Sequence, residues 1–263
     1  MIDLDIPDFD SAADAIISDL APVYDDTCRI ENAWRRCPEV RQLATSPQIL
    51  DTLAHLYGRK AFAFQTLNFN RGTQQATHSD TIHFDSNPAG FMAGVWVALE
   101  DIDANNGPLR YYPGSQKLPH ATLNDFGVDR LDGHDTYLLY RSVYEPGIES
   151  IVQEQGFIAE EAHLKRGQAL IWSANLLHGG QPILDPARTR HSQVTHYYFE
   201  DCGYFTPLLS DEERGLFRRY PVDIKTGRNV GGSANGKKIK VPMTQRIKSA
   251  AKNVLRSGTR YKR

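Results

Sequence analysis

Apolar residues in the first 60 positions recur at the spacing of amphipathic helices. Ser11 can cap one helix, which Pro22 ends, with apolar positions Ala12, Ala15, Ile16 and Leu20. Ser46 can cap a second, with Pro47 at its first position and Gly58 after its end, and an apolar face of Ile49, Leu50, Leu53 and Leu56. These helices carry no pattern that points to chemistry, so we expect them to pack against the rest of the chain.

From Lys60 onward the pattern changes to short β-branched and aromatic runs, which Gly, Pro and Asn residues separate. We predict strands over Ala61–Asn70, Phe91–Leu99, Leu109–Tyr112, Tyr137–Tyr144, Gln168–Trp172 and Arg190–Phe199. No helix of normal length alternates with them, which argues against a parallel, doubly wound sheet. The pattern favours a mainly β fold, a double-sheet jelly roll or barrel, with N-terminal packing helices.

The last 60 residues differ in character from this strand-rich part. Ser210-Asp211-Glu212-Glu213 is a capping box that predicts a short helix through Phe217. The Gly-rich segment 227–236 is expected to be flexible. Residues 244–257 place apolar side chains at helical spacing among basic ones, which predicts an amphipathic helix. We therefore expect one domain over 1–222, with a helical part at about 1–59, a jelly-roll core at about 60–205, and a basic, partly flexible extension over 223–263.

Charge marks the same boundary. The chain has 263 residues and a net charge of −2, but residues 225–263 contain 12 Lys and Arg and no Asp or Glu. The extension can be a solvated tail, an amphipathic helix on an anionic membrane surface, or an electrostatic platform for an anionic or carrier-bound small molecule. Its one aromatic residue, Tyr261, leaves no interleaved stacking residues, so nucleic acid is not an expected partner.

Other features bear on the compartment. The sequence has no run of about 18 apolar residues that would span a membrane. The acidic N-terminus lacks the basic and apolar regions of a signal peptide. Three cysteines are an odd number without metal-binding spacing, which fits a reducing compartment. These features predict a cytoplasmic protein.

The candidate chemistry begins with His78 and Asp80. Residues two apart in an extended strand point to the same side, so an imidazole and a carboxylate face one point. His178 follows at the end of a later predicted strand. Two histidines and one carboxylate on one face of an octahedral ion form the facial triad of non-haem Fe(II) oxygenases, which leaves three positions open. A second pair of the same spacing, His83 and Asp85, competes with the first.

Arg190 and Ser192 lie 12 and 14 residues after His178 and share one face of the next predicted strand. A guanidinium matches a carboxylate with two parallel hydrogen bonds, and a hydroxyl can add one donor. Together they could hold the far carboxylate of a dicarboxylic co-substrate whose near end chelates the metal. A surface ion pair is the alternative role for Arg190. No Gly-x-Ser-x-Gly turn is present, so a serine hydrolase is not expected.

Over roughly residues 60 to 200 the chain resembles the phytanoyl-CoA dioxygenase family of iron(II)- and 2-oxoglutarate-dependent oxygenases. The most specific blocks are Asn105-Asn106-Gly107-Pro108-Leu109 and Tyr112-Pro113-Gly114-Ser115-Gln116-Lys117. The resemblance continues through His78-Ser79-Asp80-Thr81, Val95-Trp96-Val97-Ala98-Leu99-Glu100, Gly167-Gln168-Ala169, His178-Gly179-Gly180, Arg190 and His196-Tyr197. The family usually has glutamine where this chain has Ser79.

The resemblance implies Fe(II), 2-oxoglutarate and O₂ as cofactors and assigns the site residues. It favours His78 over His83, because the family's metal motif precedes a tryptophan by about the 18 residues that separate His78 from Trp96. It implies His78, Asp80 and His178 as metal ligands and Arg190 as the anchor of 2-oxoglutarate. It places Trp96 and Gln65 in the co-substrate pocket, although Trp96 can also be a core residue.

The resemblance also bears on substrate and outcome. His83 and Phe84 follow the metal motif directly and are expected to touch the substrate. His196 shares a strand face with Arg190 and could hydrogen-bond near the site, but a structural role is expected. Residues 118–167 are expected to form part of a lid. Related halogenases replace the carboxylate with a small residue, so Asp80 implies hydroxylation of an unactivated C–H bond of a small molecule, with release of succinate and CO₂. A cupin-like metal enzyme that does not use 2-oxoglutarate and a catalytically silent binding barrel remain alternatives.

Overall fold

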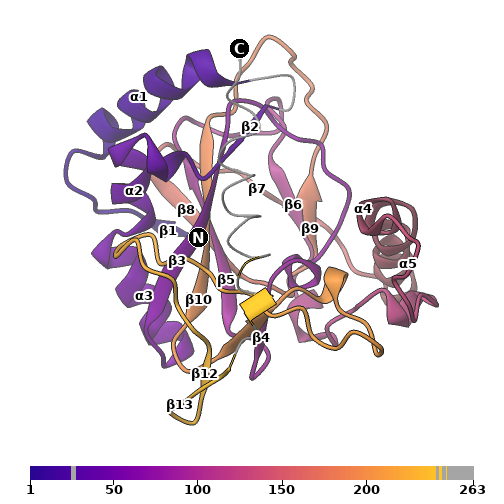
Figure 1. Ribbon diagram of the computed structural model, residues 1–263. Coiled ribbons are helices and arrows are strands. Elements are labelled where there is room, and N and C mark those ends of the chain that lie inside the picture. Colours follow the sequence, from indigo (N-terminus) through magenta and orange to yellow (C-terminus); the bar gives the residue numbers. More distant parts are fainter. Residues whose placement is uncertain (25–27, 241–242, 245–246, 248–263) are drawn as a thin grey trace.

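Two antiparallel sheets, joined by an apolar layer, form the centre of the structure (Figure 1). The computed structural model describes residues 1–24, 28–240, 243, 244 and 247. Within these residues the larger sheet has the spatial order β1 (Ile2–Asp3), β8 (Gln168–Ser173), β5 (Met92–Ala98), β10 (Ser192–Phe199), β3 (Ala61–Phe69) and β2 (Arg29–Glu31). Each neighbouring pair is antiparallel. The mainly β, antiparallel character predicted from the sequence is confirmed.

The smaller sheet has the order β7 (Glu160–Ala162), β6 (Leu109–Tyr111) and β9 (His178–Gly180), again antiparallel. Apolar side chains from both sheets, among them Trp96, Leu170 and Ala162, form one cluster between them. Two further strand pairs extend the fold: β4 (Asp85–Asn87) with β11 (Gly203–Phe205), and β12 (Ser233–Ala234) with β13 (Lys237–Lys238).

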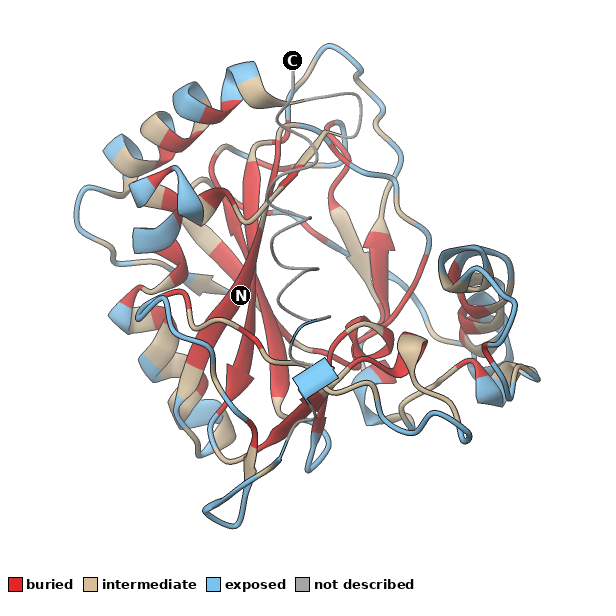
Figure 2. Cartoon of the chain, in the orientation of Figure 1, coloured by how far each residue is buried: buried red, intermediate tan, exposed pale blue. Residues whose placement is uncertain are grey.

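Three helices cover the outer face of the larger sheet: α1 (Phe9–Leu20), α2 (Pro38–Ala44) and α3 (Pro47–Tyr57) (Figures 1 and 2). Alternation along β5 explains this layering. Val95 and Val97 pack under the helices, whereas Trp96 and Ala98 face the space between the sheets. Short 3₁₀ helices occur at Ala21–Val23, Ala33–Arg35, Asp80–Ile82, Ser115–Lys117, Asn124–Phe126 and Pro207–Leu209.

The predicted helix boundaries need small corrections. The first helix begins at Phe9 rather than after Ser11, and it buries Ala13, Ile16 and Leu20, so Ala12 and Ala15 lie off the buried face. The second runs from Pro47 to Tyr57 and is followed by Gly58 in the left-handed conformation, as predicted. Ser46 occupies its N-cap position, but its side chain makes no capping hydrogen bond. Leu56 is 60 % exposed and does not belong to its buried face. The helix α2 was not predicted.

The predicted strand Tyr137–Tyr144 is wrong, because this segment is helical. It contains α4 (Thr136–Leu139) and a π-helix (Tyr140–Tyr144), which continues directly into α5 (Glu145–Gln155). The Asp135 side chain caps the start by accepting hydrogen bonds from the backbone N–H groups of Tyr137 and Leu138. Tyr140, Tyr144 and Ile148 recur at helical spacing and are buried in one cluster. The aromatic run has strand-like composition, but its spacing is helical.

The predicted helix from Ser210 to Phe217 is also wrong. The Ser210 hydroxyl donates to the Thr206 carbonyl and accepts from the Phe217 N–H, so it does not cap a following turn. Asp211 and Gly215 form an isolated backbone bridge instead. Ile224 and the short β12–β13 pair belong to the expected extension, and Ile224 is fully buried against the helical layer. The expected amphipathic helix over 244–257 falls outside the described residues, apart from positions 244 and 247.

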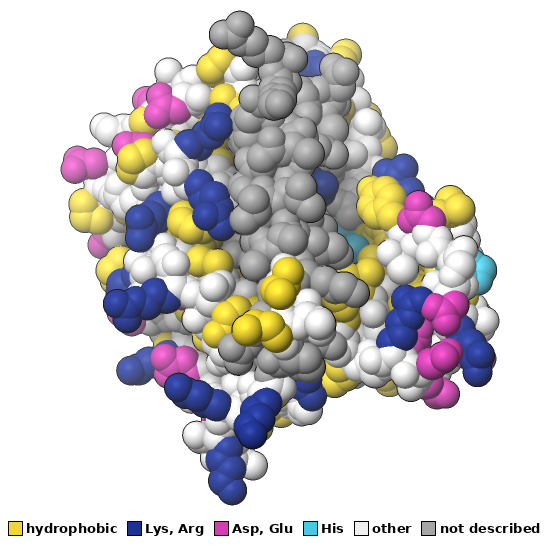
Figure 3. Space-filling model, in the orientation of Figure 1, with side chains coloured by type: hydrophobic (Ala, Val, Ile, Leu, Met, Phe, Trp, Pro, Cys, Tyr) yellow, Lys and Arg dark blue, Asp and Glu magenta, His cyan; other side chains and the backbone are white. Residues whose placement is uncertain are grey.

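Among the described residues, no helix combines the length and the apolar character that a membrane crossing requires. Figure 3 shows Lys and Arg side chains along the left margin and lower end of one face, over the helical layer and the β12–β13 pair. Acidic side chains also lie along the left margin, and charges of both signs are mixed over α4 and α5 on the right.

Candidate functional site

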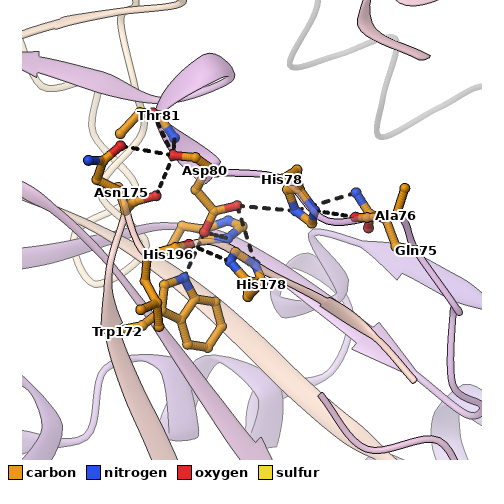
Figure 4. Close-up of polar contacts among 12 residues, drawn as sticks. Gln75, Ala76, His78, Asp80, Thr81, Trp172, Asn175, His178 and His196 are labelled. Carbon is orange, nitrogen blue, oxygen red and sulfur yellow. Dashed lines mark hydrogen bonds and ion pairs between the residues drawn. The ribbon is translucent and has the colours of Figure 1, made fainter. Parts of the chain in front are cut away.

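His78, Asp80 and His178 come together at one point between the two sheets (Figure 4). The Nε2 atoms of His78 and His178 lie 3.9 Å and 4.0 Å from Asp80 Oδ1, and all three side chains are buried. Asp80 starts a 3₁₀ helix rather than lying in a strand, but Ser79 is extended, so residues 78 and 80 still point the same way.

Both imidazoles are oriented by hydrogen bonds to carbonyls of their own segments. The Nδ1 atom of His78 lies 2.9 Å from the Ala76 carbonyl oxygen, and that of His178 lies 2.9 Å from the Leu176 carbonyl oxygen. A carbonyl only accepts, so each Nδ1 carries a proton, and Nε2 is the nitrogen that a neutral ring leaves free for a metal. Carbonyl-oriented histidines of this kind are typical of metal sites.

Electrostatics keep His78 and Asp80 in the forms that bind a metal. Desolvation by burial and the nearby His178 lower the pKa of His78 to about 4. Burial alone would raise the pKa of Asp80, but the neighbouring His178, His196 and His78 hold it at about 2. Near neutral pH the site therefore offers a neutral His78 and an ionised Asp80. Two imidazoles and a carboxylate fit a non-haem Fe(II) centre.

Backbone pairing fixes the spacing of the ligands. His78 and His178 form a bridge with N–O distances of 2.9 Å and 3.0 Å, and the Asp80 N–H donates to the Ala174 carbonyl at 2.9 Å. Gly179 and Gly180 allow this contact. A Cβ atom on either would lie 2.8 Å from backbone atoms of Gln75 and Gln74, respectively, which is closer than real Cβ contacts.

The three candidate ligands open into a cavity of about 350 Å³. Arg190, Trp96 and Gln65 line it together with the ligands, as do His83 and Phe84. The residues predicted for metal, co-substrate and substrate therefore share one hollow, with one exception. Ser192 is fully buried and does not line the cavity, and its hydroxyl accepts a hydrogen bond from Arg190 Nη1 at 3.1 Å.

Arg190 is 6 % exposed, and the described residues offer its guanidinium no carboxylate within ion-pair distance. Nη1 donates to Ser192 and Nη2 to the Arg71 carbonyl, whereas the buried Nε has no partner. The guanidinium lies 5.2 Å from the centre of the Trp96 ring and 5.5 Å from that of Phe69. Desolvation lowers its pKa to about 10. A buried cation that faces a cavity, with no carboxylate of the described residues within ion-pair distance, fits the carboxylate of a dicarboxylic ligand.

Comparison with known proteins agrees with this geometry. The family described as Phytanoyl-CoA dioxygenase (PhyH) matches residues 21–192, which is more than half of the chain. This chain belongs to the phytanoyl-CoA dioxygenase family.

Individual relatives are more distant. Phytanoyl-CoA dioxygenase, peroxisomal, from Rattus norvegicus is 24 % identical over 188 residues, covering 66 % of this chain and 50 % of the relative. The Homo sapiens protein is 22 % identical, with the same coverage. The chain therefore spans about half the length of these curated members of the phytanoyl-CoA dioxygenase family.

Solved structures of similar fold extend the comparison. The non-heme alpha ketoglutarate dependent carbocyclase SnoK has a TM-score of 0.61 at 16 % identity, covering 88 % of this chain and 87 % of its own. EctD from S. alaskensis with 2-oxoglutarate and 5-hydroxyectoine has a TM-score of 0.56 at 18 % identity, covering 91 % and 82 %. These likenesses show that the chain shares the fold of these two proteins.

Two residues of the phytanoyl-CoA dioxygenase signature, Asn106 and Ser115, do not line the cavity but hydrogen-bond to backbone next to residues that do. The Asn106 side-chain amide donates to the carbonyls of Asp101 and Thr189, each at 3.0 Å, and Thr189 directly precedes Arg190. Ser115 accepts a hydrogen bond from the N–H of Leu177, the residue before His178. The signature blocks thus hydrogen-bond to the residues that directly precede Arg190 and His178.

Ser79, which departs from the family pattern, has a local role. Its hydroxyl contacts the Ala174 carbonyl, Asn175 Oδ1 and Thr81 Oγ1, and it does not line the cavity. The competing pair His83 and Asp85 is separated, because Asp85 Oδ2 lies 2.9 Å from His120 Nδ1 while His83 faces the cavity.

Several cavity residues were not predicted. Trp172 donates a hydrogen bond to Asp80 Oδ2, and the Nε2 atom of His196 lies 3.7 Å from the same oxygen. His196 therefore lies beside a candidate metal ligand. Tyr137 and Tyr140 line the cavity from the helical segment that the sequence had suggested was a strand. The Arg219 guanidinium stacks over the Phe84 ring, 4.6 Å from its centre. Helical spacing was the signal available for the two tyrosines, and the strand face shared with Arg190 was the signal for His196.

Proposed function

We propose that this chain is an Fe(II)- and 2-oxoglutarate-dependent dioxygenase that hydroxylates an unactivated C–H bond of a small molecule and releases succinate and CO₂. The observation that carries the proposal is the combination of His78, Asp80 and His178 with the buried Arg190, which forms no ion pair among the described residues, in one cavity. A metal triad alone suits many enzymes. A buried guanidinium in the same hollow specifically suits a co-substrate with a second carboxylate.

Each residue has a separate task. His78, Asp80 and His178 would hold the iron, which with 2-oxoglutarate and O₂ would supply the oxidising chemistry. Arg190 binds the distal carboxylate, and Ser192 keeps that guanidinium in place. Trp96 and Gln65 form the adjoining walls. Because Asp80 occupies the position that a halide would need, hydroxylation is the expected outcome.

A further part of the cavity lining is the proposed substrate side. It comprises His83 and Phe84 with Tyr140, whose ring centre is 4.7 Å from that of His83. Arg219 on the Phe84 ring adds a cation to this wall, and Thr206 Oγ1 accepts a hydrogen bond from it at 3.1 Å. Aromatic surface beside a cation supports a small-molecule substrate with an apolar body and an anionic group.

The decisive test measures succinate formed from 2-oxoglutarate, with and without Fe(II), in the presence of a panel of small carboxylates and phosphate esters. Wild-type protein is expected to form succinate only with Fe(II). His78→Ala and Asp80→Ala are expected to lose this activity to background, because each removes one of three metal ligands. His163→Ala, at a half-exposed histidine outside the cavity, is the matched control and is expected to retain it.

The outcomes separate the alternatives. Iron binding without consumption of 2-oxoglutarate would favour a cupin-like enzyme that needs no Arg190. Failure of the wild-type protein to bind iron would favour a silent binding barrel. Full Fe(II)-dependent turnover in Asp80→Ala would exclude the proposed metal site.

A further inference from the structure

The two oxygens of Asp80 lie in different surroundings (Figure 4). Oδ1 faces the Nε2 atoms of His78 and His178, where a metal would lie. Oδ2 accepts a hydrogen bond from the indole Nε1–H of Trp172 at 2.8 Å. The Nε2 atom of His196 lies 3.7 Å from the same oxygen. One oxygen is therefore held by the protein and the other is left for the metal.

Trp172 reaches Asp80 because the neighbouring strand leaves room for its ring. It lies on β8 and is buried, and its strand partner on β5 is Gly94. A Cβ atom at position 94 would lie 2.3–2.8 Å from three atoms of the indole. The ring also packs against His178, with 5.1 Å between ring centres. The same indole thus contacts two of the three candidate ligands.

His196, the other neighbour of Asp80 Oδ2, is held in place by Gln65. Its Nδ1 atom lies 2.9 Å from Gln65 Oε1, and the two residues are direct partners on β10 and β3. The pairing register shifts just after His196, which is typical of a bulge that re-aims a side chain. Gln65 and His196 thereby form a second support along the Oδ2 side of Asp80.

We propose that Trp172 is a positioning residue that keeps Asp80 bound to iron through one oxygen only. Carboxylates can bind a metal through one oxygen or two. With one oxygen, the three ligands leave three of six positions open, two for a chelating keto acid and one for O₂. With two oxygens, only two positions remain, which is one too few. This inference rests on the proposed function. It states that the Trp172 hydrogen bond is the reason why a third coordination position of the metal would stay free.

The test compares Trp172→Phe, which keeps an aromatic ring but removes the N–H, with the wild-type protein in anaerobic titrations with Co(II). We expect the dissociation constant for Co(II) to rise about 10- to 100-fold, the usual effect of losing a partner of a metal ligand. At saturating Co(II) the visible absorption bands, which report coordination number, are expected to differ from the wild type. Trp34→Phe is the matched control, because it removes an indole hydrogen bond to Asn32 outside the cavity.

A measurement on the wild-type protein covers the case in which Trp172→Phe fails to fold. The chain has three tryptophans, so the indole N–H resonances can be assigned with Trp34→Phe and Trp96→Phe. On addition of Zn(II), the Trp172 resonance is expected to shift while its N–H stays protected from exchange with solvent.

Unchanged Co(II) affinity and spectra in folded Trp172→Phe would overturn the proposal, as would rapid exchange of the Trp172 N–H in the metal-bound protein. Neither result depends on turnover. The wild-type protein could bind Co(II) more tightly than Trp172→Phe, with different absorption bands, and still form no succinate. The proposed function would then fail, while the role of Trp172 would stand.

Discussion

At the scale of single residues, Arg190 shows how a binding role can be recognised from what a side chain lacks. Its charge is buried against Trp96 and Phe69, and the described residues supply it with one hydroxyl and one carbonyl. Burial of a cation without an anion costs free energy that the fold must offset elsewhere. A ligand carboxylate would pair with this charge on binding. We therefore expect Arg190 to contribute to the free energy of ligand binding rather than to the free energy of folding.

This argument predicts the effect of Arg190→Gln. The apparent KM for 2-oxoglutarate is expected to rise roughly 10- to 100-fold, because hydrogen bonds to a charged group contribute about 1.5–3 kcal/mol each. Thermal stability is expected to stay level or increase, since an unpaired buried charge is removed. Steady-state kinetics at fixed Fe(II) and a thermal melt check both.

Arg188→Gln is the matched control for this prediction. Arg188 lies two residues earlier and pairs with Asp103 at 2.7 Å on the surface. The KM for 2-oxoglutarate should not change in this variant. An unchanged KM in Arg190→Gln would instead place the anchor elsewhere.

Residue spacing and family resemblance were enough to predict the residues that now share the cavity: His78, Asp80, His178, Arg190, Trp96, Gln65, His83 and Phe84. They were not enough for Trp172 and His196. These two contact Asp80 through strand pairing and through the space left by Gly94, and neither feature is encoded in a local motif. Supporting contacts of this kind emerge only from tertiary structure.

At the scale of secondary-structure elements, α3 shows how one apolar pattern can contain both core and surface positions. Leu53 is fully buried among the residues between the helices and the larger sheet. Leu56 is three residues further on and is 60 % exposed, because the sheet supports only part of the helix circumference.

This difference predicts opposite outcomes for two equal truncations. Leu53→Ala is expected to lower the free energy of unfolding by about 2–5 kcal/mol, through lost burial and the cavity left behind. Leu56→Ala should change it by no more than about 0.5 kcal/mol. Urea unfolding followed by circular dichroism measures both. Equal losses would contradict the packing of α3 on the sheet.

The segment from Thr136 to Gln155 explains why the sequence predicted the sheets better than the elements that cover the cavity. Strand composition identified five strands, because burial on both faces selects β-branched and aromatic residues. The same composition in Tyr137–Tyr144 led to a wrong prediction. Tyr137 and Tyr140 line the cavity, and Tyr140 and Tyr144 pack in a buried cluster, so their aromatic character reflects these contacts rather than a strand. The π-helix at Tyr140–Tyr144 fits the frequent occurrence of such turns at functional sites.

At the scale of the whole molecule, the candidate metal ligands connect parts that are distant in sequence. His178 belongs to the smaller sheet, whereas Asp80 hydrogen-bonds Trp172 of the larger sheet. A bound ion would therefore link both layers, so metal binding and overall stability should be coupled.

This coupling predicts thermal stabilisation by metal alone. At a free Co(II) concentration about 100 times the dissociation constant, the folded state gains about 2.7 kcal/mol, which corresponds to a rise in Tm of roughly 5–10 °C for a chain of this size. Anaerobic calorimetry with and without Co(II) checks this. His78→Ala should abolish the shift, and His163→Ala should preserve it.

The hydrogen bonds of Asn106 and Ser115 have a consequence for how new specificities can arise on this scaffold. Both side chains hydrogen-bond to the backbone near Arg190 and His178, and both precede the segment 118–159 in the chain. This segment returns to the smaller sheet at β7, which pairs with β6. If the proposed function holds, we expect residues between these two attachment points to be exchangeable without loss of the metal and keto-acid sites.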